Sequence, residues 1–304
     1  RKVKNGMDDY CYHGAFERWA EDNGHDNFDS STVPNCVILN PGNDAEFALD
    51  LEGNGELTRV TIPGRYFDIP KYRRKYNAFE FFWERPWDGK WSVQGSYTWA
   101  HSRGNAEGYV NSSIEQGDAG ITQDFDFPSF MDGADGKLPN NRRHTIKVFG
   151  VAQIAEEWRL GTNWLIQSGR PINCLGFVPE DARDFDGSGS YISPSSFYCV
   201  DRIETDAQGN PHPVSVLRPR GSVGETPWVT SIDLSLAWIP KFANSNLTLK
   251  VDVFNVFNAK RALQYNETGD LNRGSPVQNR DFRLIDTYQS PRAVRFTARY
   301  DFSL

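Results

Sequence analysis

Apolar and polar residues alternate without interruption at the end of the chain. From Val294 to Leu304 every even-numbered residue is apolar, and from Arg295 to Ser303 every odd-numbered residue is polar or charged. This period of two predicts a β-strand with one apolar and one polar face. A soluble sheet can show the same period, but an aromatic-rich amphipathic strand in the last position is typical of the closing strand of an outer-membrane β-barrel.

The same period recurs upstream and predicts about seven strands of one style. Their expected ranges are 72–87, 91–101, 142–155, 158–168, 226–239, 246–258 and 291–303. In the range 226–239, Trp228 and Trp238 share the apolar face. At about 3.3 Å per residue and a tilt near 40°, they are about 25 Å apart along the membrane normal, which is the height of an outer-membrane apolar band.

The connections between these strands alternate in length. Residues 86–90, 156–157 and 240–245 are short turns, whereas 104–141, 170–225 and 259–290 are long and rich in Gly, Asp, Asn, Pro and Ser. Short turns at one end and long loops at the other are typical of the periplasmic and extracellular ends of a bacterial barrel. A soluble sandwich meets the same solvent at both ends and has no reason to keep this alternation. The pattern therefore predicts an all-β transmembrane barrel in the bacterial outer membrane.

The barrel interpretation assigns each face of the strands a role. Aromatic residues near the strand ends are predicted to form the membrane girdles: Trp91, Trp99, Trp158, Trp228, Trp238, Tyr300 and Phe302. Charged residues on the other face are predicted to face the lumen and a plug: Glu80, Glu84, Lys147, Arg159, Asp233, Lys250, Asp252, Arg295 and Arg299. Direct contact with a solute is expected in the long loops instead.

Composition alone points elsewhere. The hydrophobic fraction is 38% and the mean hydropathy is -0.61, which is typical of soluble proteins. A barrel strand, however, needs only about ten residues and shows lipid half of them. No run approaches the roughly 18 apolar residues of a membrane helix. The net charge of -7 argues against a nucleic-acid partner, which requires a basic surface.

Seven strands do not close a bacterial barrel, which needs an even number of at least about eight. Residues 1–8 carry no apolar face long enough to cross a membrane. We therefore expect the C-terminal part of a larger barrel, in which residues 1–304 all belong to one barrel domain. The start at Arg1, with neither an initiator Met nor a signal segment, indicates a mature piece or an internal fragment.

The four cysteines fall into two pairs within loop-like sequence. Cys11 and Cys36, and likewise Cys174 and Cys199, are separated by 25 positions. We interpret them as two local disulfides formed in an oxidising compartment, although four cysteines allow three pairings. A metal site is disfavoured because no CxxC or regular Cys/His spacing is present.

Candidate chemistry is sparse. Asp184, Asp186 and Ser188 resemble the first half of a calcium loop, but Ser195 stands where a bidentate Glu is required, so an ordinary turn is the better interpretation. No other cofactor is predicted. The five histidines are scattered and no catalytic motif accompanies them, so no catalytic residue and no enzyme activity are predicted.

Several phrases resemble a known family. The run from Val251 to Asn258, followed by Pro291 to Phe302, resembles the last two strands of TonB-dependent outer-membrane receptors. Gly95 to Trp99, Gly104 to Gly108, Gly136 to His144 and Ser168 to Pro171 resemble the Oar-like branch of that family. The resemblance extends from about Asn40 to the end of the chain.

This resemblance implies a barrel of about 22 strands with an internal plug, energised through TonB. The plug and the segment that contacts TonB are not in these residues. The implied partners are outer-membrane lipid, the TonB complex through that plug, and an unknown extracellular solute. A bulky solute is expected, a peptide or glycan rather than a metal chelate. The alternatives are a barrel for surface adhesion or protein secretion, and, more distantly, a soluble glycan-binding β-protein.

Overall fold

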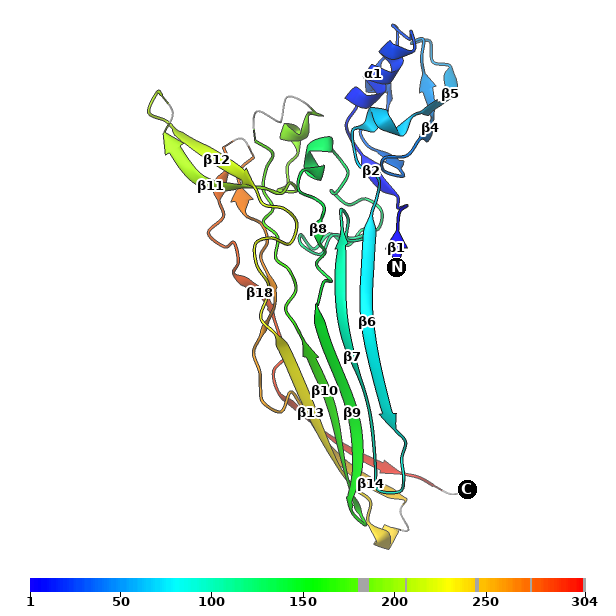
Figure 1. Cartoon of the computed structure of the whole chain (residues 1–304), viewed down its shortest axis with the longest axis vertical. Helices are drawn as coiled ribbons and strands as arrows, with labels where there is room; N and C mark the ends of the chain where they lie inside the picture. Colours follow the sequence, from blue (N-terminus) through cyan, green and yellow to red (C-terminus); the bar gives the residue numbers. More distant parts are fainter. Residues whose placement is uncertain (180–185, 206, 244–245, 274, 303–304) are drawn as a thin grey trace.

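The computed structural model describes residues 1–304 except 180–185, 206, 244–245, 274 and 303–304. Its largest element is a nine-stranded antiparallel sheet in the order β1-β6-β7-β9-β10-β13-β14-β19, with β8 also paired to β7. The long strands are β6 (Arg74–Arg85), β7 (Trp91–Gly104), β9 (His144–Ala155), β10 (Trp158–Gln167), β13 (Val229–Trp238), β14 (Leu247–Phe254) and β19 (Ala293–Tyr300). Six of the seven ranges named from the sequence contain one of them, whereas β7 begins with the range 91–101 and extends beyond it to Gly104. The result is an elongated, curved sheet that winds as a meander (Figure 1).

The short connections gather at one end of the sheet, here called the turn end (Figure 1). The β6–β7 turn is held by Asp88, whose Oδ1 accepts hydrogen bonds from the backbone N–H groups of Lys90 and Trp91, each at 2.9 Å. Gly89 has φ +92°, a conformation that L side chains rarely adopt. A short 3₁₀ helix, η5 (Lys241–Ala243), lies between β13 and β14. These local interactions fix the strand pairing at the turn end.

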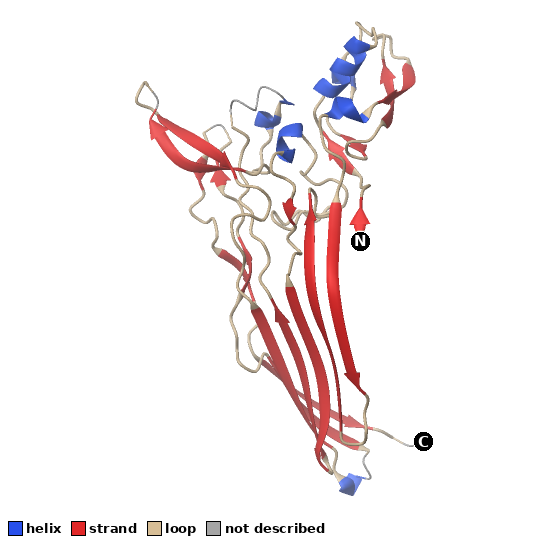
Figure 2. Cartoon of the chain, in the orientation of Figure 1, coloured by secondary structure: helices blue, strands red, loops and turns tan. Residues whose placement is uncertain are grey.

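The long connections gather at the opposite end, the outer end, and contain short elements (Figure 2). Two antiparallel pairs are formed by β11 (Tyr198–Thr205) with β12 (Pro211–Leu217) and by β15 (Ala262–Tyr265) with β18 (Ile285–Tyr288). The remaining elements are β8 (Gly136–Lys137), β16 (Asp270–Leu271), β17 (Val277–Gln278), η3 (Pro128–Met131) and η4 (Ser188–Ser190). The loops thus carry structure of their own.

Residues 4–73 form a small unit at the outer end, which the sequence analysis did not predict (Figure 1). It contains α1 (Gly14–Asp22), the pairs β2 (Asp8–Tyr10) with β3 (Val37–Leu39) and β4 (Ala45–Asp50) with β5 (Leu57–Ile62), and the 3₁₀ helices η1 (Ser30–Thr32) and η2 (Gly64–Phe67). Tyr10, Phe16 and Phe67 are fully buried in its core and pack edge to face. The unit is connected to the sheet through β1 (Lys2–Val3), which pairs with β6. Residues 2–3 therefore extend the sheet by a two-residue strand rather than by a strand that crosses.

The buried apolar clusters lie in the small unit and among the outer loops, whereas the long strands keep large apolar side chains exposed. Phe296 is 79% exposed and Phe79 is 62% exposed. A soluble sheet would cover such a face with a second layer. Among the described residues, no helix is long and apolar enough to span a bilayer.

Candidate functional site

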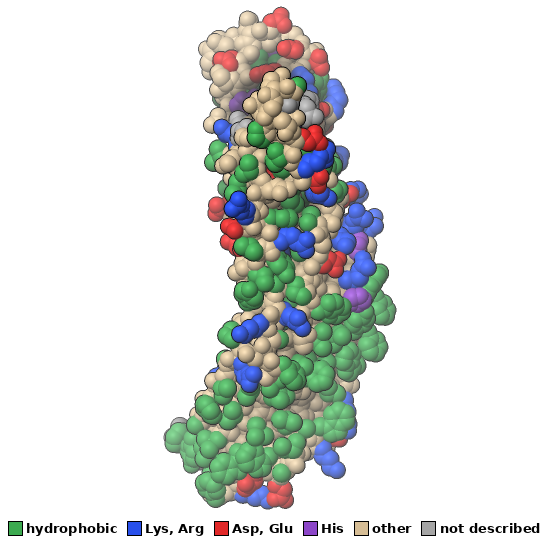
Figure 3. Space-filling view, turned by 90° about the vertical axis from the view of Figure 1, so that its left-hand side faces the viewer, with side chains coloured by type: hydrophobic (Ala, Val, Ile, Leu, Met, Phe, Trp, Pro, Cys, Tyr) green, Lys and Arg blue, Asp and Glu red, His purple; other side chains and the backbone are tan. Residues whose placement is uncertain are grey.

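One face of the sheet, the apolar face, is continuous across the long strands. The registers place Phe81 of β6 opposite Tyr97 of β7, and Leu234 of β13 opposite Val253 of β14. Figure 3 shows hydrophobic side chains gathered over the lower half of the molecule. Leu234 and Leu236 are each 36% exposed in the middle of β13, and Trp228 is 50% exposed at its outer end. This row lies on the surface, as a lipid-facing strand requires.

Aromatic residues lie at both ends of this face. At the outer end, Tyr97 and His144 share a hydrogen bond of 2.9 Å, and the His144 ring stacks on Trp228 at 5.7 Å. At the turn end, Trp158 and Trp238 stack at 6.0 Å. Rings with a polar atom are suited to the membrane interface, where one edge is wet and the other is apolar.

The predicted girdle residues divide between these two ends. Trp99 and Trp228 lie toward the outer end, while Trp91, Trp158, Trp238, Tyr300 and Phe302 lie toward the turn end. Trp91 also receives the guanidinium of Arg85 over its ring at 4.0 Å. This is a cation–π contact, which favours a fixed position of the ring.

The opposite, polar face contains every residue predicted to face the lumen. The pairing registers place Glu80, Glu84, Lys147, Arg159, Asp233, Lys250, Asp252, Arg295 and Arg299 on the same side of the sheet. Their separation from the apolar side chains follows from the strict period of two in each strand. Contact between these residues and a plug remains a prediction.

Asp252 is the most enclosed carboxylate on the polar face, with a side chain that is 7% exposed. Lys250 Nζ lies 2.8 Å from its Oδ1, and Arg295 donates to its Oδ2 through Nη2 at 2.9 Å and Nε at 3.1 Å. The residues come from the neighbouring strands β14 and β19. Because one carboxylate is paired with two cations, the group formed by Lys250, Asp252 and Arg295 carries a net positive charge on the polar face of the sheet.

A second polar group surrounds Asp233 of β13. Its Oδ2 accepts a hydrogen bond from Asn163 Nδ2 at 3.1 Å, and its Oδ1 accepts one from the backbone N–H of Asn255 at 2.8 Å. Asn255 has φ +48° and marks the end of the regular strand, where the sequence pattern also becomes irregular. Asp233 is thus a carboxylate with structural partners on β10 and directly after β14.

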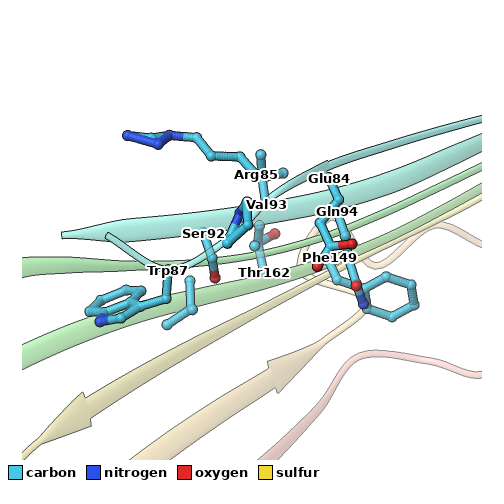
Figure 4. A pocket seen from close by; sticks show the side chains of 11 residues that line it. Glu84, Arg85, Trp87, Ser92, Val93, Gln94, Phe149 and Thr162 are labelled. Carbon is cyan, nitrogen blue, oxygen red and sulfur yellow. The ribbon is translucent and has the colours of Figure 1, made fainter. Parts of the chain in front are cut away.

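A cavity of about 510 Å³ lies near the turn end (Figure 4). It is lined by Glu84 and Trp87 from the β6 end, Ser92 and Gln94 from β7, and Phe149 from β9, among others. Phe149 and Gln94 are cross-strand partners. Because the apolar ring of Phe149 lies among polar side chains, the cavity suits contact with another protein segment rather than with water alone.

Two buried ion pairs join the outer loops, and sequence reasoning missed both. Arg170 Nη2 donates to Glu267 Oε1 at 2.6 Å, and Arg220 Nη2 donates to Asp124 Oδ1 at 2.9 Å. Arg220 also donates through Nε to the carbonyl of Ala134 at 2.7 Å. The two partners are 97 positions apart in the first pair and 96 in the second, so no local spacing signals the pairs. They tie the three long connections into one packed cap.

The small unit contacts the cap through buried carboxylates. Asp8 accepts hydrogen bonds from the backbone N–H and the hydroxyl of Thr122, at 2.7 Å and 2.5 Å. Burial raises the pKa of Asp8 to about 8. Burial, followed by the charge of Asp9, raises the pKa of Asp126 to about 9. Such groups are largely protonated at neutral pH and avoid the cost of a buried charge.

Both predicted disulfides are present. Cys11 is bonded to Cys36 and Cys174 to Cys199. The first links the chain before α1 to the start of β3 within the small unit, and the second links the cap to β11. The described residues also bring an Asp9 oxygen within 4.8 Å of both sulfurs of the first bridge. Since metals bind thiolates and these sulfurs are bonded to each other, this group does not make a metal site.

The calcium candidate is only partly described. Asp184 lies outside the described residues. Asp186 is buried and accepts hydrogen bonds from the backbone N–H groups of Ser129 at 2.8 Å and Ser188 at 2.9 Å. Both of its oxygens therefore have structural partners, and a calcium role stays an untested expectation.

The outer end also holds a cavity of about 620 Å³ between the small unit and the cap, with both polar and apolar walls. Tyr12, His13 and Glu17 line it from the small unit, and Phe127 and Tyr191 from the cap. Aromatic rings beside carboxylate and imidazole groups are suited to polar ligands with apolar faces, such as sugars and peptides.

Comparison with known proteins gives one sequence relative. No protein-family model matches the chain. Over 280 residues, or 79% of this chain, 26% of positions are identical to the TonB-dependent transporter Oar of Myxococcus xanthus. The chain spans about a quarter of that relative's length, since it covers 24% of it. The relative is a transporter by name, in agreement with the prediction that the chain is not an enzyme.

Solved structures of outer-membrane proteins are also similar. The outer membrane transporter YddB from Escherichia coli matches with 13% identity and a TM-score of 0.41, over 88% of this chain and 29% of its own. The ferric-catecholate import receptor Fiu from E. coli matches with 12% identity and a TM-score of 0.42, over 80% of this chain and 22% of its own. The sequence relationship is the stronger of the two kinds of similarity. In sequence, the chain is therefore similar to a TonB-dependent transporter of the Oar type, which is the resemblance that its motifs predict.

Proposed function

We propose that the protein to which these residues belong transports a bulky polar solute across the bacterial outer membrane and is energised through TonB. The observation that carries the proposal is the division of one sheet into an exposed apolar face and a charged polar face. The apolar face needs lipid, and the polar face suits the interior of a plugged barrel. Kinship with a TonB-dependent transporter supplies the mode of energy coupling.

The partners follow from this proposal. Lipid of the outer membrane covers the apolar face, and a plug, outside these residues, occupies the polar side and connects to the TonB complex. The charged groups around Asp252 and the cavity beside Phe149 provide contacts for that plug. Because charged and polar groups dominate the polar face, these contacts are expected to be ion pairs and hydrogen bonds that can be broken during transport.

The solute is proposed to be a peptide or a glycan. The cavity of about 620 Å³ at the outer end is lined by Tyr12, Tyr191, His13 and Glu17, among others. Two aromatic rings can pack against sugar or side-chain faces, while the carboxylate and imidazole bind hydroxyl or amide groups.

Uptake in cells carrying the full-length protein tests the function. Fluorescently labelled oligopeptides and oligosaccharides are supplied to the wild type, to a deletion strain and to a strain without TonB. We expect accumulation to require both the protein and TonB. Uptake that continues without TonB contradicts the energy coupling. Normal uptake of every class in the deletion strain, together with lost cell adhesion or secretion, supports the adhesion or secretion alternative instead.

A further inference from the structure

A row of four cations crosses neighbouring strands at the outer end of the apolar face. The registers place Lys2 of β1 opposite Lys75 of β6, Lys75 opposite Arg103 of β7, and Arg103 opposite Lys137 of β8. Directly opposed side chains lie on the same face of a sheet, about 5 Å apart at Cβ. We call Lys2, Lys75, Arg103 and Lys137 the outer basic row.

The outer basic row lies on the face that meets lipid. Along β6, Lys75 is followed on the same side by Asn77 and then by Phe79, which is 62% exposed. Along β7, Arg103 is followed on the same side by His101 and then by Trp99. Four residues correspond to about 13 Å along a strand, or about 10 Å along the membrane normal at a tilt near 40°. This places the cations above the apolar belt, at the depth of lipid headgroups.

The row is largely without carboxylate partners. Among the ion pairs of the described residues, Lys137 alone has one, Glu225, at 3.0 Å. Lys2, Lys75 and Arg103 are exposed and form none within the described part of the chain. Arg143 adds a further exposed cation, and the charges of Arg103, Arg143, Lys137 and Lys75 all act on the His101 ring. Figure 3 shows Lys, Arg and His side chains gathered directly above the apolar area.

Like charges directly opposite one another destabilise a sheet. An anion that binds such a row of four residues on adjacent strands offsets this repulsion. At the turn end of the same sheet, by contrast, Arg85 is paired with Asp88 at 2.5 Å, and Lys241 is paired with Glu156. Among the strand pairs of the described residues, cations lie directly opposite cations in this row at the outer end.

We propose that the outer basic row binds the phosphate groups of an anionic lipid in the outer leaflet of the membrane. Strands are about 4.8 Å apart, so the row spans about 14 Å and can hold a headgroup with more than one phosphate. Arg103 offers the bidentate geometry that phosphate favours, and the lysines act as point charges. The acyl chains of the same molecule lie against Phe79, Phe81 and Trp99, which favours a lipid over free phosphate. The proposal is independent of the solute that is carried.

Lipid binding by the full-length protein in detergent tests the proposal. The probes are bisphosphorylated lipid A, the same lipid without its phosphates, and inorganic phosphate, with bound copies counted by native mass spectrometry. The double variant Lys75→Gln with Arg103→Gln removes two cations of the row. The matched control, Lys90→Gln with Lys241→Gln, removes two cations at the turn end.

We expect the double variant to bind bisphosphorylated lipid A at least tenfold more weakly, while the control binds it as the wild type does. Equal binding of the lipid without phosphates, or unchanged binding in the double variant, overturns the proposal. Displacement of the lipid by inorganic phosphate at equal concentration identifies a free-phosphate site and also overturns it. Should the double variant fail to fold, the charge-preserving variant Lys75→Arg with Arg103→Lys is compared with single Gln variants. The proposal is supported if the charge-preserving variant still binds bisphosphorylated lipid A and the single Gln variants lose this binding. Equal binding of the lipid by all these variants contradicts it.

Discussion

The guanidinium of Arg220 donates to Asp124 Oδ1 at 2.9 Å, and both side chains are almost completely shielded from solvent. Arg220 also lies over the ring of Phe197 at 4.8 Å. A buried pair of this kind is weak evidence for stability as such, but the loss of one partner leaves an uncompensated buried charge. The pair therefore serves as a sensitive probe of how the cap is held together.

Arg220→Ala is expected to destabilise the cap by about 3 to 5 kcal/mol, because Asp124 then remains buried without its cation. Limited proteolysis of the full-length protein checks this, with faster cleavage expected in the three long connections. The matched control is Arg218→Ala, whose exposed pair with Asp201 contributes about 0 to 1 kcal/mol. Equal cleavage rates in the two variants would contradict the structural role assigned to Arg220.

Leu234→Arg places a charge on the apolar face in the middle of β13. The expected cost is about 2 to 4 kcal/mol near the bilayer centre, with impaired assembly in the outer membrane. The amount of heat-resistant protein in outer-membrane fractions is the measurement. Leu271→Arg, at a 45% exposed position in the cap, serves as the control and should assemble normally. Normal levels of Leu234→Arg would show that the two faces have been assigned the wrong way round.

Lys250→Ala is expected to disturb the proposed plug more than the fold. Asp252 keeps Arg295 as a partner in this variant, so the carboxylate is not left alone. Solute uptake should fall while the heat-resistant barrel remains at the wild-type level. Loss of the heat-resistant form in this variant counts against the assignment of Lys250 to plug contact.

The contact between the small unit and the cap should weaken as pH rises. Burial raises the pKa of Asp8 to about 8 and that of Asp126 to about 9, from an ordinary value of 3.8. The folded protein therefore holds these protons more tightly than the unfolded chain does. The stability of the contact is full below about pH 4 and decreases as pH rises toward 9, because only the unfolded chain gains by releasing the protons.

Hydrogen exchange of residues 108–127 between pH 5 and pH 9, corrected for intrinsic exchange, measures this effect. Opening of the segment is expected to become more frequent with rising pH. Asp126→Asn removes one of the two ionising groups and should make the profile shallower, whereas Asp118→Asn, in the same loop, should leave it unchanged. If the exchange profile against pH is the same in the wild type, Asp126→Asn and Asp118→Asn, ionisation of Asp126 is ruled out as the cause of the opening.

The large sheet could be predicted from the sequence because the alternation of apolar and polar residues is a local pattern within each strand. In β13, each side chain from Trp228 to Trp238 is assigned to a face by position alone, and the tight turn at Asp88 and Gly89 marks the strand ends. Cysteine spacing likewise gave both disulfides. The resemblance to the Oar-like branch is confirmed by the sequence relative.

The structure of the outer end could not be predicted from local sequence patterns in the same way. The Arg170–Glu267 pair joins residues 97 positions apart, and its partners sit in loop sequence without a regular period. In the small unit, α1 carries Phe16 and Trp19 three positions apart on its buried side, but a helix of nine residues is a weak signal amid polar neighbours. Such features depend on tertiary packing that becomes visible only when distant segments meet.

The small unit enters and leaves the sheet through directly paired residues, since Val3 lies opposite Arg74. Its two attachment points are therefore one strand spacing apart, about 5 Å. The small unit can therefore be exchanged for another segment, or shortened to a tight hairpin, while the strand registers of the large sheet stay unchanged. The pairing of Val3 with Arg74 thus marks a point where foreign segments can be grafted.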